Sequence, residues 1–207
     1  MVGEGDDGTR PPGFEEAVAA LVAGGAVVVP TDTVYGVAAL PSVPGATDRL
    51  AALKGRPIRQ PLAVLVADLA VAWSLVEAPE PEVERLARRC WPGPLTLVLR
   101  RAPAARALAL GGDPTTIGLR CPDHTLVRAL AERVGPLATT SANRHGEPTP
   151  TTAAEAAAAL TGPLAAVLDG GTCSGMASTV VDCTSATWRV LREGAVGLDA
   201  IEAAARP

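Results

Sequence analysis

The stretch VVVPTDTVYG, residues 27–36, joins an apolar run to a group of small polar side chains. Residues 27–29 are all valine, which predicts a buried β-strand, and Pro30 ends it because proline cannot donate a ladder hydrogen bond. Thr31, Asp32 and Thr33 follow at once. In open α/β sheets, ligands bind beyond the carboxyl ends of strands. The stretch therefore indicates a strand that ends in a binding site, although a turn or a helix N-cap would use the same residues.

Outward from this stretch, apolar runs alternate with helical patterns. Strands are predicted at 26–30, 61–68, 115–120, 136–143, 164–171, 178–183 and 188–193, and a tight turn leads into a strand within 91–100. Helices are predicted at 14–25, 45–57, 69–90 with a break at 78–82, 124–135, 149–160 and 197–205. Thr151 or Thr152, together with Glu155, is expected to cap the helix at 149–160. This alternation predicts an α/β fold with a twisted, mixed, open sheet and flanking helices.

The composition is that of a globular protein, with 48% hydrophobic and 19% charged residues in a chain of 207. Residues 1–12 predict a disordered lead-in, and residues 13–207 predict a single domain because no linker divides them. No apolar run reaches the roughly 18 residues of a membrane span, and the polar N-terminus does not have the pattern of a signal peptide. The sequence therefore predicts a cytoplasmic protein with no membrane partner.

Charge and cysteine usage exclude several classes of site. The net charge of -4 argues against a general nucleic-acid coat, although a local basic cleft is compatible with it. Cys90, Cys121, Cys173 and Cys183 form no CxxC pair, so no zinc or other metal site is predicted, and the cysteines are interpreted as free thiols. The glycines of residues 169–175 do not match a P-loop and are interpreted as an ordinary loop.

Other strand ends also carry hydroxyl, amide and cationic side chains. They are Arg120, Ser141, Asn143 and Arg192, with Lys54, Arg56, Arg59 and Gln60 before the strand at 61–68. This set of side chains suits a phosphate-containing ligand. Each group also has a structural explanation, as a solvated helix end, as turn residues or as surface strand residues. The residue pattern alone therefore predicts an anionic ligand and nothing finer.

Taken in order, several segments resemble those of one family. They are PTDTVYG, KGRP with QPL, WPGPLTLVL, TIGLR, TTSAN, ASTVVD and VLREG. Together they resemble the YrdC/TsaC family, the threonylcarbamoyl-AMP synthases, in its short single-domain form, over residues 14–196. The resemblance implies a twisted sheet around a deep, positively lined cavity.

The resemblance also implies a reaction. L-threonine, bicarbonate and ATP would give threonylcarbamoyl-AMP and pyrophosphate, which is a nucleotidyl transfer, with Mg²⁺ entering on ATP. The product would serve the threonylcarbamoyladenosine modification of tRNA, so tRNA or a separate transferase complex is an expected partner. No Ser-His-Asp or Cys-His group is evident, and the chemistry needs only positioning of the substrates and neutralisation of phosphate charge.

The family's site residues can be placed on this sequence one at a time. The resemblance implies threonine contacts from Thr33, Arg120, Thr139 and Ser178. It implies ATP contacts from Lys54, Arg56, Gln60, Thr116, Ser141, Asn143, Thr149 and Arg192. Lys54 and Arg56 are the catalytic candidates, and we expect Arg56→Ala to slow the reaction by on the order of 10²–10³. Arg120 suits a carboxylate because a guanidinium can bind one with two parallel hydrogen bonds.

The sequence departs from the family pattern at Asp32, where Glu is usual, and at Gln60, Leu65 and Ala177, where Lys or Asn, His and an acidic residue are common. Two other functions share the fold. An RNA-binding translation or ribosome-assembly factor would use the same basic cavity, but the acidic net charge and the 2% aromatic content argue against base stacking. A paralogue acting in hydrogenase maturation would carry zinc fingers and an acylphosphatase-like part, which this sequence does not contain.

Overall fold

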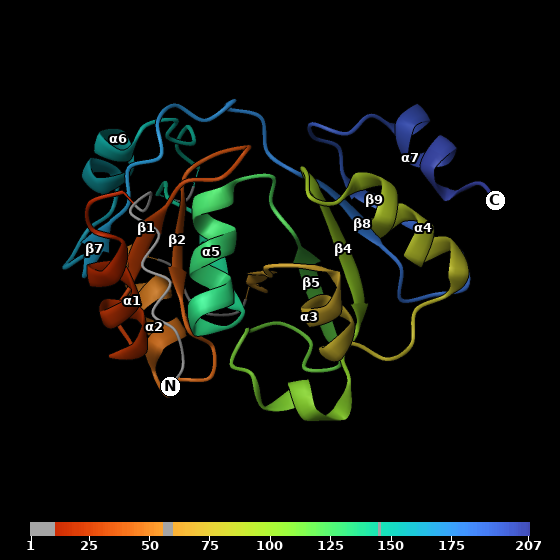
Figure 1. Ribbon diagram of the computed structural model, residues 1–207, viewed down its shortest axis with the longest axis horizontal. Coiled ribbons are helices and arrows are strands. Elements are labelled where there is room, and N and C mark those ends of the chain that lie inside the picture. Colours follow the sequence, from red (N-terminus) through yellow and green to blue (C-terminus); the bar gives the residue numbers. More distant parts are fainter. Residues whose placement is uncertain (1–10, 56–59, 145) are drawn as a thin grey trace, which may run out of the picture.

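The computed structural model describes residues 11–55, 60–144 and 146–207, whose strands form one twisted nine-stranded sheet (Figure 1). The strand order is β7-β1-β2-β6-β3-β5-β4-β8-β9. The strands are β1 (Val27–Val29), β2 (Gly36–Ala39), β3 (Ala63–Leu65), β4 (Leu95–Arg100), β5 (Thr116–Arg120), β6 (Leu137–Ser141), β7 (Ala166–Val167), β8 (Thr179–Asp182) and β9 (Arg189–Arg192). The pairs β1/β7, β3/β5 and β4/β8 are parallel and the others antiparallel, so the predicted mixed, open sheet is confirmed.

Helices flank the sheet near the positions that the sequence predicts. They are α1 (Phe14–Val22), α2 (Ala46–Leu53), α3 (Leu69–Ser74), α4 (Pro81–Cys90), α5 (Thr125–Val134), α6 (Ala153–Ala159) and α7 (Leu198–Ala205), with a 3₁₀ helix, η1 (Pro103–Ala107), that was not predicted. The predicted break divides α3 from α4, and Pro81 stands in the first turn of α4, where its missing N–H costs nothing. Thr152 is the N-cap of α6 and forms a capping box with Glu155. None of the helices described is both long and apolar enough to cross a bilayer.

Side chains alternate between the two faces of the sheet, and the two faces differ in what covers them. One face carries Val28, Val37, Val64, Leu97 and Leu119, all fully buried. They belong to the larger hydrophobic cluster, which also contains side chains of α2, α4, α6 and α7. The side chains of this face are therefore buried in the hydrophobic core.

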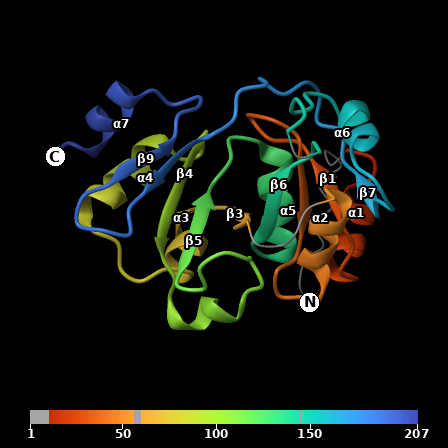
Figure 2. The same cartoon turned by 180° about the vertical axis from the view of Figure 1, so that it is seen from behind.

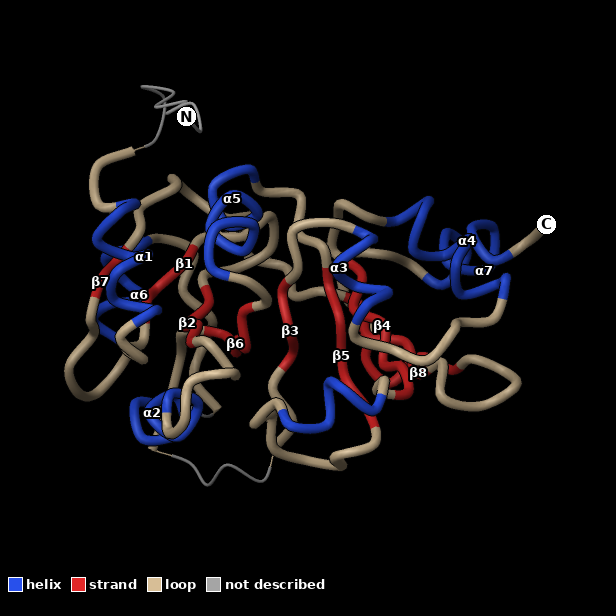
Figure 3. The backbone as a smooth tube through the Cα atoms, turned by 60° about the horizontal axis from the view of Figure 1, so that its bottom comes forward, coloured by secondary structure: helices blue, strands red, loops and turns tan. Residues whose placement is uncertain are grey.

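The second face is covered only in part. It carries Val27, Val29, Ala38, Leu65 and Leu137, which pack with α1 and α5 in a smaller cluster. Figure 3 shows α1 and α5 on one side of β1 and β2, with α2 on the other side. In the view from behind, β5 and β4 lie toward one end of the sheet, away from α1 and α5 (Figure 2). The part of the second face around β5 and β4 is therefore not covered by α1 or α5.

The largest difference from the sequence prediction follows the opening stretch. Residues 31–33 do form a turn, but it leads into strand β2 rather than into a helix, and Val29 pairs with Gly36. The residues of β2 read GVAA, and three of the four, Gly36, Ala38 and Ala39, have low β-propensity, so no strand was predicted there. β2 forms because β1 and β6 pair with it on both sides. The predicted strand at 164–171 was also wrong in extent, since only Ala166 and Val167 pair.

Candidate active site

The uncovered part of the second face lines a cavity of about 400 Å³. In β4, Leu95, Leu97 and Leu99 enter the core while Thr96 and Val98 line the cavity. The same alternation brings one polar or small side chain after another to the cavity from neighbouring strands. They include Ala63 of β3, Thr116, Gly118 and Arg120 of β5, Thr139 and Ser141 of β6, Ser178 and Val180 at β8, and Arg192 of β9. A cavity of this size can hold a small-molecule ligand.

The cavity is positively lined. Within the part of the chain that the structure describes, every charged side chain in its wall is an arginine, namely Arg101, Arg120 and Arg192. Hydroxyl groups of threonine and serine make up most of the remaining polar wall. Guanidinium and hydroxyl donors together suit carboxylate and phosphate groups, so the expected basic cavity is confirmed.

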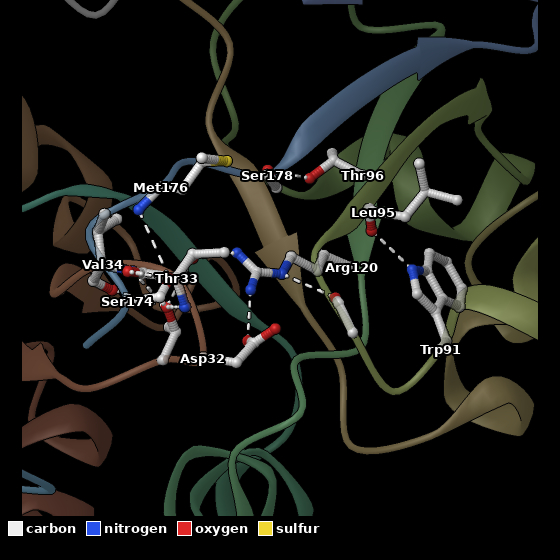
Figure 4. Close-up of polar contacts among 12 residues, drawn as sticks. Asp32, Thr33, Val34, Trp91, Leu95, Thr96, Arg120, Ser174, Met176 and Ser178 are labelled. Atoms are coloured by element: carbon white, nitrogen blue, oxygen red, sulfur yellow. Dashed lines mark hydrogen bonds and ion pairs between the residues drawn. The ribbon is translucent and has the colours of Figure 1, made fainter. Parts of the chain in front are cut away.

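Arg120 stands at the carboxyl end of β5 and is held from three sides (Figure 4). Its Nη1 donates to Thr33 Oγ1 at 2.8 Å and its Nε donates to the Gly93 carbonyl at 3.1 Å. Its Nη2 donates to the carboxylate of Asp32, and the two side chains are only 7% and 15% exposed. Burial lowers the pKa of Arg120, and the charge and hydrogen bond of Asp32 oppose that shift. Arg120 is therefore a buried cation with a fixed orientation. The alternative interpretation of Arg120 as a surface strand residue was wrong.

The turn after β1 is fixed by its own hydroxyl groups. Thr31 Oγ1 donates to the Val34 carbonyl at 2.6 Å and accepts from the Thr33 and Val34 amides. Thr31 Oγ1 also lies 2.9 Å from Thr33 Oγ1. Short hydroxyl side chains stabilise turns by such local bonds to the backbone. The turn thereby presents Thr33 to Arg120 and to the cavity.

The long connection from β7 to β8 crosses the molecule beside this turn (Figure 1). Ser174 Oγ and the Gly175 amide both donate to the Thr33 carbonyl, at 3.2 and 2.8 Å. Tyr35 is fully buried, and its hydroxyl donates to the Gly171 carbonyl at 2.8 Å. Residues 169–175 are thus a loop, as predicted, and Tyr35 packs and bonds rather than facing the cavity.

Ser178 and Arg192 meet at the far side of the same pocket. Arg192 Nη2 donates to the Ser178 carbonyl at 2.8 Å, and the Ser178 hydroxyl lies 2.9 Å from Thr96 Oγ1. Burial lowers the pKa of Arg192. The hydrogen bonds of Arg192 within the described residues are donated by Nε and Nη2 to Ser178, which is neutral. Its Nη1 group and its charge therefore remain available to a ligand.

Thr139 and Gly36 explain why the opening stretch ends in glycine. Thr139 Oγ1 donates to the Val37 carbonyl at 3.2 Å and lines the cavity. A Cβ atom on Gly36 would lie 2.8 Å from Thr139 Oγ1, which is closer than real contacts allow. A larger residue at this position would force the threonine hydroxyl or the strand to shift.

Lys54 is buried and 6% exposed, so its interpretation as a solvated helix end was wrong. It follows α2, and its Nζ donates to the Ser141 carbonyl at 2.5 Å and to Asn143 Oδ1 at 3.3 Å. Ser141 Oγ in turn donates to Asn143 Oδ1 at 2.5 Å. Three residues placed on the nucleotide side by resemblance therefore form one cluster, of which Ser141 reaches the cavity wall.

The other predicted residues fall into three groups. Thr116 and Thr149 line the cavity, and Gln60 is exposed beside the cavity residue Pro61. Arg56 and Arg59 lie outside the described residues. Of the four departures from the family pattern, Leu65 and Ala177 belong to the cavity wall.

Sequence reasoning missed two cavity residues, Thr96 and Arg101, and one contact, that of Asp32 with Arg120. Thr96 lies in a strand read only for its leucines, and the polar position between Leu95 and Leu97 was the available signal. Arg101 follows β4 directly, as another charged residue at a strand end. The contact of Asp32 with Arg120 had no local signal, since 88 positions separate the two residues.

Comparison with known proteins agrees with this geometry. The model of the Sua5/YciO/YrdC family, described as telomere recombination, matches residues 19–194. The threonylcarbamoyl-AMP synthase of Bacillus subtilis is 37% identical over 201 residues, which cover 96% of this chain and 58% of that protein. The putative threonylcarbamoyl-AMP synthase of Mycobacterium tuberculosis strain H37Rv is 40% identical over 197 residues, which cover 95% of this chain and 90% of that protein.

Solved structures give the same result. The crystal structure of P. abyssi Sua5 complexed with L-threonine superposes with a TM-score of 0.84 at 35% identity, covering 92% of this chain and 56% of that one. The E. coli YciO structure superposes with a TM-score of 0.81 at 26% identity, covering 91% of this chain and 92% of that one. The chain thus spans little more than half the length of some relatives and about nine tenths of others.

Proposed function

Because the chain belongs to the Sua5/YciO/YrdC family, we propose that it is an L-threonylcarbamoyladenylate synthase. It forms threonylcarbamoyl-AMP and pyrophosphate from L-threonine, bicarbonate and ATP. One observation carries the proposal: a single cavity is lined both by Arg120, Thr33, Thr139 and Ser178, which the resemblance assigns to threonine, and by Thr116, Ser141 and Thr149, which it assigns to ATP. The relatives named threonylcarbamoyl-AMP synthase and the Sua5 complex with L-threonine support this substrate set.

Threonine binds with its carboxylate on Arg120. The guanidinium is already oriented by Thr33 and the Gly93 carbonyl, so little order is lost when the substrate arrives. The hydroxyls of Thr33, Thr139 and Ser178 complete the wall around the amino acid. Arg192 donates to the Ser178 carbonyl beside this wall, and in this proposal it binds the α-phosphate that the carbamate attacks.

The reaction needs two bond-forming steps and no covalent enzyme intermediate. The neutral amine of threonine attacks the carbon of bicarbonate, and loss of water leaves a carbamate. A carbamate oxygen then attacks the α-phosphorus of ATP, and the bond to the pyrophosphate oxygen breaks. Arg192 and Lys54 neutralise charge on the phosphates, with Arg56 assigned to the same task by resemblance.

ATP enters as its Mg²⁺ complex, since Mg²⁺ prefers phosphate oxygens and water to a cage of protein ligands. Use of the product for tRNA modification in the cytoplasm, through tRNA or a transferase complex, is part of the same proposal. The RNA-binding alternative gains no support from the cavity, whose walls contain no aromatic side chain among the residues described.

The test is mass spectrometry of the purified chain with ATP, Mg²⁺, bicarbonate and threonine, quenched quickly. We expect threonylcarbamoyl-AMP and pyrophosphate in the full mixture and neither when threonine is omitted. A folded chain that forms no adduct and releases no pyrophosphate would overturn the proposal. A salt-sensitive affinity for RNA in that case would favour the binding-factor function.

A further inference from the structure

Arg101 is a buried cation of the cavity that the resemblance does not assign. It is 2% exposed and contributes to the cavity wall. Its backbone amide donates to the Thr115 carbonyl at 2.8 Å, and its Nε donates to the Thr116 carbonyl at 2.6 Å. Its Nη1 donates to the Leu108 carbonyl at 3.1 Å. The side chain is therefore fixed in direction, and Nη2 has no acceptor among the described residues.

The charge of Arg101 is not compensated by the protein around it. Both of its side-chain acceptors are neutral carbonyls, and no carboxylate of the described residues lies within ion-pair distance of it. Asp113 is the one acid that raises its pKa, against a larger lowering by burial, and that carboxylate is held by Thr115. A guanidinium stays charged at any relevant pH, and a buried charge without a partner is costly. An anionic ligand group would remove that cost.

The position of Arg101 in the cavity indicates which anionic group of the ligand would lie beside it. Arg101 adjoins the start of β5 at Thr116, whereas Arg120 ends the same strand. Four residue steps of about 3.3 Å separate the two ends, or about 13 Å. In an in-line displacement the leaving group departs on the side of phosphorus opposite to the attacking oxygen. If the amino acid lies on Arg120, the departing phosphates point away from it.

We propose that Arg101 forms a subsite for the terminal phosphates of the nucleoside triphosphate, and so for the pyrophosphate that leaves. This inference rests on the proposed function and adds to it a residue that binds the leaving group. The β- and γ-phosphate oxygens accept hydrogen bonds from the free Nη2 and the second hydrogen of Nη1. Charge that develops on the leaving oxygens is stabilised there without movement of the protein.

The experiment compares the affinities of ATP and AMP, whose difference reports the terminal phosphates. Isothermal titration calorimetry is done on the full chain and on Arg101→Met, with Arg106→Met as a matched control, because Arg106 is a half-exposed arginine paired with Glu77. We expect the ATP-to-AMP affinity ratio to fall at least about tenfold in Arg101→Met, as for loss of a charged hydrogen bond. The control should keep the wild-type ratio.

Two results would overturn the inference alone, with the wild-type chain still binding ATP and forming the adduct. One is an unchanged ratio in Arg101→Met. The other is an equal loss of ATP and AMP affinity, which would mean that Arg101 only fixes the backbone at Leu108 and Thr116. A wild-type chain that binds neither nucleotide would instead overturn the proposed function and this inference with it.

A second measurement uses the unaltered protein, in case Arg101→Met does not fold. The arginine side-chain NMR signals are titrated with inorganic pyrophosphate and with AMP, and the Arg101 signal is assigned from Arg101→Lys. We expect pyrophosphate to shift the Arg101 Nε signal and AMP to leave it in place. A signal that moves equally with both, or with neither, contradicts the inference.

Discussion

The guanidinium of Arg120 lies between the carboxylate of Asp32 and the hydroxyl of Thr33, two side chains of one short turn. The turn follows β1 and the arginine ends β5, and two strands, β6 and β3, separate β2 from β5 in the sheet. A cation at the cavity is thus oriented by the same stretch that ends the first strand. The first two predictions follow from this contact.

Arg120→Lys should impair threonine binding selectively. Lysine keeps the charge but cannot reproduce the three hydrogen bonds that Arg120 makes to Asp32, Thr33 and Gly93. It also cannot bind a carboxylate with two parallel hydrogen bonds, as a planar guanidinium can. We expect the KM for threonine to rise by at least about tenfold, the loss of one charged hydrogen bond. The KM for ATP should stay within about threefold, because the residues proposed to contact the nucleotide are other ones. Steady-state kinetics with each substrate varied in turn provides the measurement, and an equal rise in both values would contradict the assignment of Arg120.

Asp32→Asn should destabilise the fold. It removes the countercharge of a buried arginine and leaves that charge without a full partner, which typically costs about 3–5 kcal/mol. Urea unfolding followed by circular dichroism gives the free energy of unfolding. Glu77→Gln is the matched control, since Glu77 pairs with Arg106 on the surface and should change stability by less than about 1 kcal/mol. Equal changes in the free energy of unfolding for the two substitutions would show that the Asp32–Arg120 pair contributes no more to stability than a surface ion pair.

Gly36→Ala should strain the sheet at Thr139. The new Cβ would sit 2.8 Å from Thr139 Oγ1, and such overpacking typically costs about 1–3 kcal/mol. Thr139→Ala in the same chain should recover part of the loss, because it removes the atom that clashes. Gly118→Ala is the comparison, since its Cβ meets Thr96 only at an ordinary 3.6 Å. The free energy of unfolding is compared for the two single variants and the double variant. If the double variant loses as much stability as the two single losses added together, the predicted clash is refuted.

Lys54→Met should reduce the use of ATP while leaving the overall fold in place. Its ammonium group donates to the Ser141 carbonyl and to Asn143 Oδ1, and Ser141 lines the cavity. We expect kcat/KM for ATP to fall by on the order of 10²–10³, as for loss of a preorganised charge. Product formation is measured by mass spectrometry, with circular dichroism as the check on folding. A fall of less than threefold would remove Lys54 from the catalytic candidates.

Stability should decrease on acidification through His124. Burial is the largest influence on its pKa and lowers it below the ordinary 6.5, and its Nδ1 has no hydrogen-bond partner among the residues described. The unfolded chain then binds a proton that the folded chain resists, so the stabilisation is complete above 6.5 and is lost as the pH falls below it.

The measurement is the urea midpoint of unfolding at two pH values on either side of 6.5, for the wild-type chain and for His124→Gln. Glutamine does not titrate, so its midpoint should fall less between the two values. A hydrogen bond with the Gly170 backbone and the charges of Asp32 and Asp123 oppose the lowering of the His124 pKa, and all of these influences are removed together with the imidazole in His124→Gln. Parallel losses in the two chains would assign the pH dependence to other groups.

Local sequence patterns predicted most of the elements and many of the cavity residues. The valine run gave β1, the threonines and Glu155 gave the cap of α6, and the proline-rich break divided α3 from α4. These features depend on side chains within a few residues of one another, and local chemistry suffices for them. The strand-end pattern singled out Arg120 and Arg192, and the resemblance added Thr139 and Ser178; all four line the cavity.

β2, Arg101 and the Asp32–Arg120 pair required the folded chain. β2 contains glycine and two alanines, which have low strand propensity, and it forms because its two neighbours pair with it. The burial of Arg101 depends on Thr116 and on Leu108, and the Asp32 contact depends on strands that are distant in sequence.

The sequence by itself determined that a hydrophobic strand ends in small hydroxyl and carboxylate side chains, because a valine run and a threonine turn each act locally. Only the tertiary structure decided which distant residues those side chains meet. The order β2-β6-β3-β5-β4-β8 places Thr33, Arg120 and Ser178 around one cavity, and that order is set by pairing between strands far apart in the chain. Such pairing arises from burial of whole faces of the sheet, which no short stretch of sequence specifies.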